Sequence, residues 1–269
     1  MNIVLDLVRW LSSNYKIKGN EVSIVEVLYH YFSDKDYSSI NTQLNIKEIE
    51  SYFDSISLKY DCLLLGNIYQ SLLGARHRHS NGVHYTQKED IHKIIDYLFY
   101  NDLLDRVNSG DTTVCSDISD MVFFDPACGC GNILVYIYHL LLGIQSSNKC
   151  DTFIKPSNFY GIELDERSSY IAQLSLSLEY FMTTGEFIEC DTIMYGDSLV
   201  VGWGSIVPKD RLSYIVANPP FLGSSNMSKK LKRVIEDNFY NFDGRDKLDL
   251  CCFWYIKAIE FIQNSDIRA

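Results

Sequence analysis

The sequence has no long apolar run, few prolines, and fewer basic than acidic residues. A membrane-spanning helix needs roughly 20 consecutive apolar residues. Every apolar stretch here is interrupted sooner, so the pattern excludes a membrane span. The N-terminal stretch also lacks a basic lead-in and carries Asp6, which argues against a signal peptide. We therefore expect a cytoplasmic protein.

The shortage of basic residues limits the surfaces that the chain can present. Its 24 lysines and arginines are outnumbered by 35 aspartates and glutamates, which gives a net charge of -11. Domains that bind nucleic acid through much of their surface are usually basic. The charge balance therefore excludes an extensive nucleic-acid-binding surface, but it leaves room for one local basic groove.

The 8 cysteines do not form two well-spaced ligand pairs. Cys128 and Cys130 flank a glycine in a turn, and Cys251 and Cys252 are adjacent in an apolar run. The pattern predicts buried, reduced thiols in a cytosolic protein rather than zinc ligands or disulfides. The histidines of residues 77–79 lie in a polar stretch and indicate a solvated loop, so we expect no metal site.

Residues 1–80 have apolar residues at helical spacing and no pattern typical of catalysis. We interpret them as an all-helical N-terminal subdomain. Its expected helices span residues 4–13, 22–32, 46–56 and 60–74, the last ended by Gly74. The polar segment 76–84, with a turn signal at Asn81-Gly82, separates it from a second domain over residues 81–269. Thr86, followed by Glu89, predicts a capping box at the next helix.

From residue 119 onward, apolar runs, turns and helical segments alternate. The expected strands lie within residues 120–125, 158–165, 192–199 and 212–221, with helices over 133–143 and 167–182 between them. The polar segment 223–247 indicates a loop with one helix, and residues 248–262 an apolar helix. Such alternation predicts an α/β domain with parallel strands and right-handed crossovers.

The segment FDPACGCGN, residues 124–132, follows the first strand and opens a helix. Its glycines allow a ligand to approach the backbone at the carboxyl edge of the sheet, where open α/β folds bind ligands. Asp125 at the strand end suits a cationic ligand group, such as the amino or sulfonium group of S-adenosylmethionine. A tight turn without a ligand is the alternative for this motif alone.

Two further strands also end in acidic residues. Glu163, at the end of the second strand, suits hydrogen bonds from both ribose hydroxyls of a nucleoside. Asp165 falls at the next helix start, where an N-terminal cap is its simpler role. Asp197 closes the third strand and suits the amino group of an adenine, although Gly-Asp-Ser is by itself a common turn.

Asn218-Pro219-Pro220-Phe221 ends the fourth strand, and neither proline can donate a hydrogen bond to a sheet. The exocyclic amine of adenine is a poor nucleophile because its lone pair is delocalised into the ring. The Asn218 side-chain oxygen and a Pro219 carbonyl held by rigid neighbours can accept its two N–H groups and aim the lone pair at a methyl donor. Phe221 supplies a face on which a flipped-out base can stack.

Together, DPACGCGN, GIELD, GDS and NPPF resemble the motifs of γ-class adenine-N6 DNA methyltransferases. The likeness is greatest to the methyltransferase region of MmeI-like (type IIL) restriction-modification enzymes. Their GxHYT, NPPFLGS and LDxxxxWYxKA segments are similar to residues 82–86, 218–224 and 248–258, and the resemblance covers about residues 60–269.

The resemblance implies a Rossmann-like S-adenosylmethionine-dependent methyltransferase core with strand order 3-2-1-4. The implied reaction is methylation of the N6 of an adenine flipped out of double-stranded DNA, in a restriction-modification or phage-defence system. An aromatic residue of the final helix, Phe253 or Trp254, is implied to pack against the cofactor adenine, with core packing as the alternative. The implied catalytic residues are Asn218, Pro219, Pro220 and Phe221. The implied cofactor-binding residues are Tyr85, Thr86, Asp125, Pro126, Ala127, Cys128, Gly129, Gly131, Glu163, Leu164, Asp197, Ser198 and Trp254.

The family continues after this final helix into three further strands and a target-recognition domain. We therefore expect a truncated chain with an incomplete sheet, whose fourth strand is an uncovered edge. Such a chain is expected to bind the cofactor weakly or to need a separate C-terminal recognition chain or domain. The basic residues Lys229, Lys230, Lys232 and Arg233 are candidates for phosphate contacts, with a solvated helix face as the alternative.

Two other functions remain open at this point. One is methylation of a glutamine side chain in a protein, by enzymes that share an Asn-Pro-Pro-aromatic loop. Phe221 in place of tyrosine, and the His84-Tyr85-Thr86 segment, favour DNA over that acceptor. The other is a cofactor-binding fragment or subunit without activity alone, against which the intact Asn218–Phe221 loop speaks.

Overall fold

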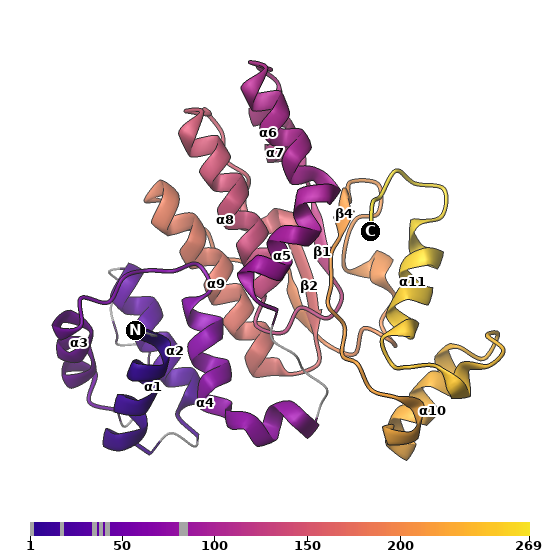
Figure 1. The fold of residues 1–269 in the computed structure, drawn as a ribbon, viewed down its shortest axis with the longest axis horizontal. Coiled ribbons are helices and arrows are strands. Elements are labelled where there is room, and N and C mark those ends of the chain that lie inside the picture. The colour runs from indigo at the N-terminus through magenta and orange to yellow at the C-terminus, as the bar shows by residue number, and fades with distance from the viewer. Residues whose placement is uncertain (1–2, 17–18, 34–36, 38–39, 41–43, 81–85) are drawn as a thin grey trace.

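The N-terminal helices form where apolar side chains recur at helical spacing. A computed structural model describes residues 3–16, 19–33, 37, 40, 44–80 and 86–269. Its N-terminal part folds into α1 (Ile3–Asn14), α2 (Glu21–Ser33), α3 (Ile46–Ser55) and α4 (Leu64–Ser80), which lie together on one side of the molecule (Figure 1). The helices predicted from the sequence in this part are confirmed.

The last of these helices is longer than the sequence predicts. Gly74 was expected to end it, but α4 continues to Ser80. A glycine inside a helix costs only about 1 kcal/mol relative to alanine, and the Ala75 and Arg76 that follow are strong helix formers. The polar segment 76–84 is therefore helical up to residue 80, and its remainder lies outside the described residues.

The N-terminal helices share a core with the rest of the chain. Leu28 of α2 and Phe53 of α3 are fully buried in a cluster that also contains Ile171 and Leu178 of α9 (Glu166–Thr184). The helical part is thus packed directly on the α/β part. A domain boundary at residue 80 stays a prediction.

A connecting layer of helices precedes the sheet. It consists of α5 (Lys88–Ile95), a π-helical turn (Asp96–Tyr100), α6 (Asn101–Asn108) and α7 (Val114–Asp120), the last of which the sequence analysis missed. The predicted capping box is wrong, because Gln87 occupies the N-cap position and no side chain caps α5. The Thr86 hydroxyl instead accepts a hydrogen bond from Asn218, 3.0 Å away.

The sheet has the predicted parallel strands in the predicted order. The strands are β1 (Phe123–Asp125), β2 (Phe159–Glu163), β3 (Ile193–Tyr195) and β4 (Tyr214–Ile215), arranged β3-β2-β1-β4. The last ladder bond of β4 runs from the Val216 N–H to the Phe124 carbonyl, 3.0 Å. The prolines that follow cannot donate another. This is the strand order that the resemblance to S-adenosylmethionine-dependent methyltransferases implies.

Alternate residues of the strands build two apolar layers. On one face Phe123 stacks on Phe159 and Tyr214, beneath α8 (Asn132–Ser147) and the connecting helices. On the other face Phe124 packs with Trp203 and with the layer that holds α10 (Lys229–Asn238) and α11 (Cys252–Ile262). Short 3₁₀ turns occur at Pro156–Asn158, Trp203–Ser205, Ser224–Asn226 and Arg245–Lys247. None of the described helices is long and apolar enough to cross a membrane.

The outer edge of β4 is not bare, which corrects the expectation of an uncovered edge. The Ile215 N–H donates to the Arg268 carbonyl at 2.8 Å, and the Arg268 N–H donates to the Ser213 carbonyl at 3.0 Å. Arg268 thus forms a parallel bridge with Tyr214. A chain segment that returns after α11 satisfies edge groups of β4 that would otherwise be unpaired.

The cysteines also differ in part from the expectation. Cys115 of α7 and Cys150, just after α8, form a disulfide, so the prediction of reduced thiols throughout is wrong for this pair. Their spacing of 35 residues carries no signal, because α7 and α8 bring them together only in the fold. The other six cysteines are free, and all but Cys252 are buried.

Candidate active site

The loop after β1 is shaped by its glycines. Gly131 has a φ of 80°, and a Cβ there would lie 2.8 Å from the Cβ of Ala172 in α9. A Cβ on Gly161 of β2 would lie 2.8 Å from the Cys128 Sγ. Both distances are too short for real carbon contacts, so only glycine lets the loop pack this closely on β2 and α9. Pro126 and Ala127 complete the turn.

Asp125 is the buried carboxylate at the base of this loop, with 1% of its surface exposed. Burial raises its pKa to about 7, a hydrogen bond from the Ala127 N–H at 2.9 Å opposes that rise, and the charge of Glu163 adds to it. A carboxyl group in this state gains most from a cationic partner, which would favour its charged form. The position therefore suits an ammonium or sulfonium group.

Glu163 at the end of β2 ties two loops together. Its Oε2 accepts the Gly129 N–H at 2.9 Å, and its Oε1 accepts the Asp165 N–H at 2.9 Å. Burial raises its pKa above the ordinary value. The carboxylate thus lies fixed at the carboxyl edge, where open α/β folds bind ligands. The next side chain, Leu164, is exposed on the surface.

Asp165 has the structural role that the sequence suggested as the simpler one. It is the N-cap of α9, and its side chain accepts the Ser168 N–H at 3.0 Å. This bond satisfies one of the free N–H groups at the helix start. Asp165 is therefore committed to α9, and Glu163 is the acid that remains available to a ligand.

The loop after β3 is held by α11. The Trp254 Nε1 donates to the Ser198 Oγ at 2.8 Å and lies 3.2 Å from the Pro126 carbonyl. Asp197 accepts the Leu199 N–H at 3.0 Å, which shapes the turn. The indole thus bridges the loops after β1 and β3. Phe253 points elsewhere, fully buried against Phe239 at 4.8 Å between ring centroids.

Lys257 is a functional candidate to which the sequence analysis assigned no role. Its Nζ donates to the carbonyls of Ser198 at 2.6 Å and Val201 at 2.8 Å. Burial lowers its pKa to about 8, against the opposing charges of Asp197 and Glu260. A lysine one helical turn after Trp254, inside an apolar helix, was the available signal. It fixes the backbone of the loop that carries Asp197.

Asn218 leaves the sheet beside Asp125, because β4 and β1 are adjacent and parallel. Its Nδ2 donates to the Thr86 hydroxyl at 3.0 Å. This bond sets the orientation of the amide. Because the nitrogen points toward Thr86, the side-chain oxygen points away from it. Tyr85, its neighbour His84 and the rest of 81–85 lie outside the described residues.

The remainder of the loop after β4 is anchored at its far end. Pro219 is buried, Pro220 is partly exposed, and the Phe221 side chain is 50% exposed. The Leu222 N–H donates to the Asp249 carboxylate at 3.1 Å, and the Leu222 carbonyl accepts the Leu250 N–H at 3.0 Å. Partial burial acts to raise the Asp249 pKa, but N–H groups including those of Cys251 and Leu222 hold it below the ordinary value.

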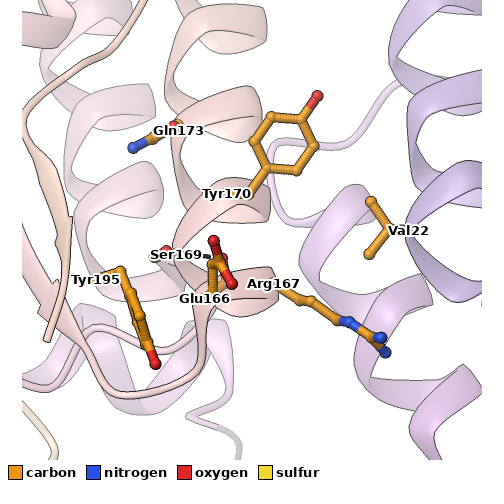
Figure 2. A pocket seen from close by; sticks show the side chains of 7 residues that line it. All are labelled: Val22, Glu166, Arg167, Ser169, Tyr170, Gln173 and Tyr195. Carbon is orange, nitrogen blue, oxygen red and sulfur yellow. Dashed lines mark hydrogen bonds between the residues drawn. The ribbon is translucent and has the colours of Figure 1, made fainter. Parts of the chain in front are cut away.

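A separate cavity lies next to this site. Figure 2 shows it between the first turns of α9 and Val22 of α2, with Tyr195 at the end of β3 on its rim. Its volume is about 420 Å³, and its lining residues are Val22, Glu166, Arg167, Ser169, Tyr170, Gln173 and Tyr195. None of these is a predicted cofactor residue. Most of the predicted residues instead lie on the loops that follow the four strands at the carboxyl edge of the sheet. This cavity is therefore not part of the predicted site.

The chain is similar to known proteins. A model of the MmeI DNA-methyltransferase domain matches residues 105–269. DNA methyltransferase A of Bacillus subtilis (strain 168) is 24% identical over 242 residues, which cover 76% of this chain and 27% of that protein. The Type II methyltransferase M.VspI of Vibrio sp. (strain 343) is 29% identical over 263 residues, which cover 93% of this chain and 55% of that protein.

A solved structure matches as well. The type IIL restriction-modification enzyme MmeI, in complex with DNA, superimposes with a TM-score of 0.71 at 22% identity, over 97% of this chain and 43% of that one. This likeness establishes the fold. The chain spans between about a quarter and about half of the length of these relatives. Because the matched family model covers more than half of the chain, the protein belongs to the family of the MmeI DNA-methyltransferase domain.

Proposed function

We propose that the chain binds S-adenosylmethionine at the carboxyl edge of its sheet and methylates the N6 amine of an adenine in double-stranded DNA. The observation that carries the proposal is the hydrogen bond from the Asn218 Nδ2 to Thr86. It holds an amide in one orientation at the end of β4, next to the strand that ends in Asp125. A structural turn would not need an oriented amide at this place.

The residues of the edge fit the cofactor. The Asp125 carboxylate suits its cationic methionine end, Glu163 its ribose hydroxyls and Asp197 its adenine amine. The Trp254 indole, fixed between the Pro126 and Ser198 loops, supplies an apolar wall for the adenine. When bound, S-adenosylmethionine supplies the electrophilic methyl group.

The loop after β4 acts on the acceptor amine. The Asn218 side-chain oxygen and the Pro219 carbonyl each accept one N–H of the amine, which turns its lone pair out of the ring plane. Because both acceptors are held before the base arrives, little reorganisation is needed during the reaction. The half-exposed Phe221 stacks on the flipped-out base. Selectivity for adenine N6 rests on this pair of acceptors.

Double-stranded DNA is the proposed partner. The family membership and the exposed Phe221 support it, and α10 places Lys229, Lys230, Lys232 and Arg233 just beyond the catalytic loop. With a net charge of -11, these residues alone supply little general affinity for DNA. We propose that recognition of a target sequence needs a further domain or chain, as the partial coverage of the relatives supports.

The test is transfer of a labelled methyl group to DNA that contains mismatched adenines, because a mispaired base is cheaper to flip. The purified chain is used in excess over DNA, and digested products are separated as nucleosides. We expect label in N6-methyladenine with the native chain, and at least about 100-fold slower labelling with Asn218→Ala. Label in another nucleoside would contradict the adenine assignment. Label on a glutamine-containing peptide but not on DNA would contradict the DNA assignment.

A further inference from the structure

Three side chains with metal-binding atoms meet away from the proposed active site. A sulfur of Cys62, a ring nitrogen of His139 and a carboxylate oxygen of Glu179 all lie within 4.8 Å of one another. Cys62 precedes α4, His139 belongs to α8, and Glu179 belongs to α9. Glu179 is 14 residues beyond the Asp165 cap, which at 1.5 Å per residue is roughly 20 Å along the helix. The methyl-transfer chemistry uses none of these three residues.

The carboxylate at the centre of this cluster is buried, with only 2% of its side chain exposed. Its Oε1 lies 2.7 Å from the His139 Nδ1, and its Oε2 accepts the Tyr60 hydroxyl at 2.6 Å. A buried carboxylate is costly unless it is paired, so a fold keeps one only with strong partners. His139 and Glu179 thus form a hydrogen-bonded pair, and this hydrogen bond raises the pKa of His139.

The thiol of Cys62 completes the cluster. Burial and the nearby Glu179 charge raise the Cys62 pKa to about 12, so the group is a neutral thiol beside the carboxylate. A divalent cation would favour the thiolate form of Cys62 instead, because a coordinated thiol loses its proton. The Lys88 ammonium lies near the cluster, but its Nζ is paired with the Asp61 carboxylate at 2.5 Å, which offsets its charge.

We propose that Cys62, His139 and Glu179 form a Zn²⁺ site, with water as the fourth ligand. One sulfur, one nitrogen and one oxygen form a donor set that suits Zn²⁺ and is too soft for Mg²⁺ or Ca²⁺. The metal binds the His139 Nδ1 in place of its proton, and this proton and the Cys62 proton leave to solvent. The half-exposed His139 gives the ion and the water a route to the site.

The geometry needs only small shifts. Zinc bonds of about 2.0–2.3 Å place neighbouring tetrahedral ligands roughly 3.5 Å apart, against the present limit of 4.8 Å. The 2.7 Å contact between the His139 Nδ1 and the Glu179 Oε1 would have to widen to admit the ion, and the Cys62 sulfur would have to approach it. Tyr60 stays on the free oxygen of Glu179 and holds the carboxylate for the metal, as outer-shell partners of zinc ligands do. The bound ion would clamp the segment before α4 to α8 and α9.

The experiment uses the full chain without an affinity tag, stripped of metal and then dialysed against Co²⁺ as a spectroscopic substitute for Zn²⁺. We expect one Co²⁺ per chain and a near-ultraviolet thiolate-to-cobalt absorption band, and displacement of both by Zn²⁺. Cys62→Ser abolishes the band, and His139→Gln, at a half-exposed position, removes stoichiometric binding. Tyr60→Phe weakens Zn²⁺ affinity by about tenfold. The matched controls Cys252→Ser and His92→Gln keep full binding.

Circular dichroism of each variant establishes that it is folded, so that a lost band reports the site. A folded native chain that binds no stoichiometric Co²⁺ or Zn²⁺ would overturn the proposal. A thiolate band that persists in Cys62→Ser would also overturn it, because another cysteine would then be the ligand. Methyl transfer is not a readout here, so failure of the active-site proposal would leave this result unaffected.

Discussion

The loop after β1 and the loop after β4 lie side by side at the carboxyl edge, but they are held in different ways. The Asp125–Gly131 loop is held by close packing, because Gly131 packs on Ala172 of α9 and the Gly129 N–H bonds to Glu163 at the end of β2. The Asn218–Leu222 loop is held by hydrogen bonds at its two ends, from the Asn218 Nδ2 to Thr86 and from the Leu222 N–H to Asp249. The first loop is preformed by its packing on β2 and α9, and the second is tethered at its two ends.

The difference matches the proposed roles. A cofactor pocket can be rigid, and close packing of glycines on a neighbouring strand makes it so. A loop that receives a flipped-out base needs an exposed face, which Phe221 has, and also fixed acceptors, which tethers provide. Variants of the preformed loop should therefore change stability and cofactor binding, whereas variants of the tethered loop should change turnover.

Asn218→Ala should give the largest effect. Removal of one of the two acceptors of the adenine amine is expected to lower kcat by about 100-fold to 1,000-fold, as loss of one preorganised hydrogen bond does elsewhere. Binding of S-adenosylhomocysteine should stay unchanged. Single-turnover methyl transfer and calorimetry measure the two quantities. Asn226→Ala, an exposed residue of the same segment, is the control and should retain both.

Gly131→Ala should give the next largest effect, which is a loss of stability. The new Cβ would lie 2.8 Å from the Ala172 Cβ at a φ of 80°, so we expect a loss of about 3 kcal/mol in the free energy of unfolding. Gly129→Ala is the matched control, since its φ is also positive but no atom lies within 4 Å. It should cost about 1 kcal/mol. Equal losses in urea denaturation would contradict close packing as the cause.

Asp125→Asn should separate stability from binding. The pKa of Asp125 is raised to about 7 in the folded chain, from an ordinary value of 3.8, so folding takes up a proton between these values. Stability should therefore fall as pH rises from about 4 to about 7 and then level off. The variant should lose this dependence and be more stable at pH 8, on the order of 2 kcal/mol.

Cofactor affinity should follow the opposite pH trend in the native chain. An ionised Asp125 attracts the amino group of S-adenosylhomocysteine, so affinity at about pH 6 should be roughly tenfold weaker than at about pH 8. Calorimetry in matched buffers measures it. An affinity that does not change across this range would exclude Asp125 as the partner of the cationic group.

Thr86→Val should give the smallest effect. It removes the acceptor for the Asn218 Nδ2 and leaves the shape of the side chain nearly unchanged. We expect kcat to fall by about tenfold, because a misplaced acceptor loses alignment, while stability changes by about 1 kcal/mol or less. Thr86→Ser keeps the hydroxyl and should restore turnover. A serine variant as slow as the valine variant would show that turnover does not depend on the hydroxyl group.

The sequence predicted features that depend on local patterns. The strands, the glycine loop and the Asp165 cap follow from neighbouring residues, whereas the strand order was implied by the family resemblance, and each is present. The end of α4 and the capping box at Thr86 were wrong for a different reason. Helix continuation through Gly74 depends on small propensity differences, and the Thr86 hydroxyl is engaged by a residue more than a hundred positions away.

Contacts between segments far apart in the sequence could not be predicted from it. Cys115 pairs with Cys150 only because α7 packs beside α8, and Arg268 covers the edge of β4 only because the chain returns after α11. The cluster of Cys62, His139 and Glu179 comes from three elements and has no spacing signature. Tertiary packing creates such contacts, and one sequence without its relatives does not reveal them.

The central claim is that Asp125 anchors a cofactor at this edge. The most direct test is calorimetric titration of the purified chain with S-adenosylhomocysteine, beside Asp125→Ala and Asn218→Ala, with folding checked by circular dichroism. The account predicts a single site in the native chain, the same affinity in Asn218→Ala and no detectable binding in Asp125→Ala. A folded native chain that does not bind, or an Asp125→Ala variant that binds equally well, would contradict it.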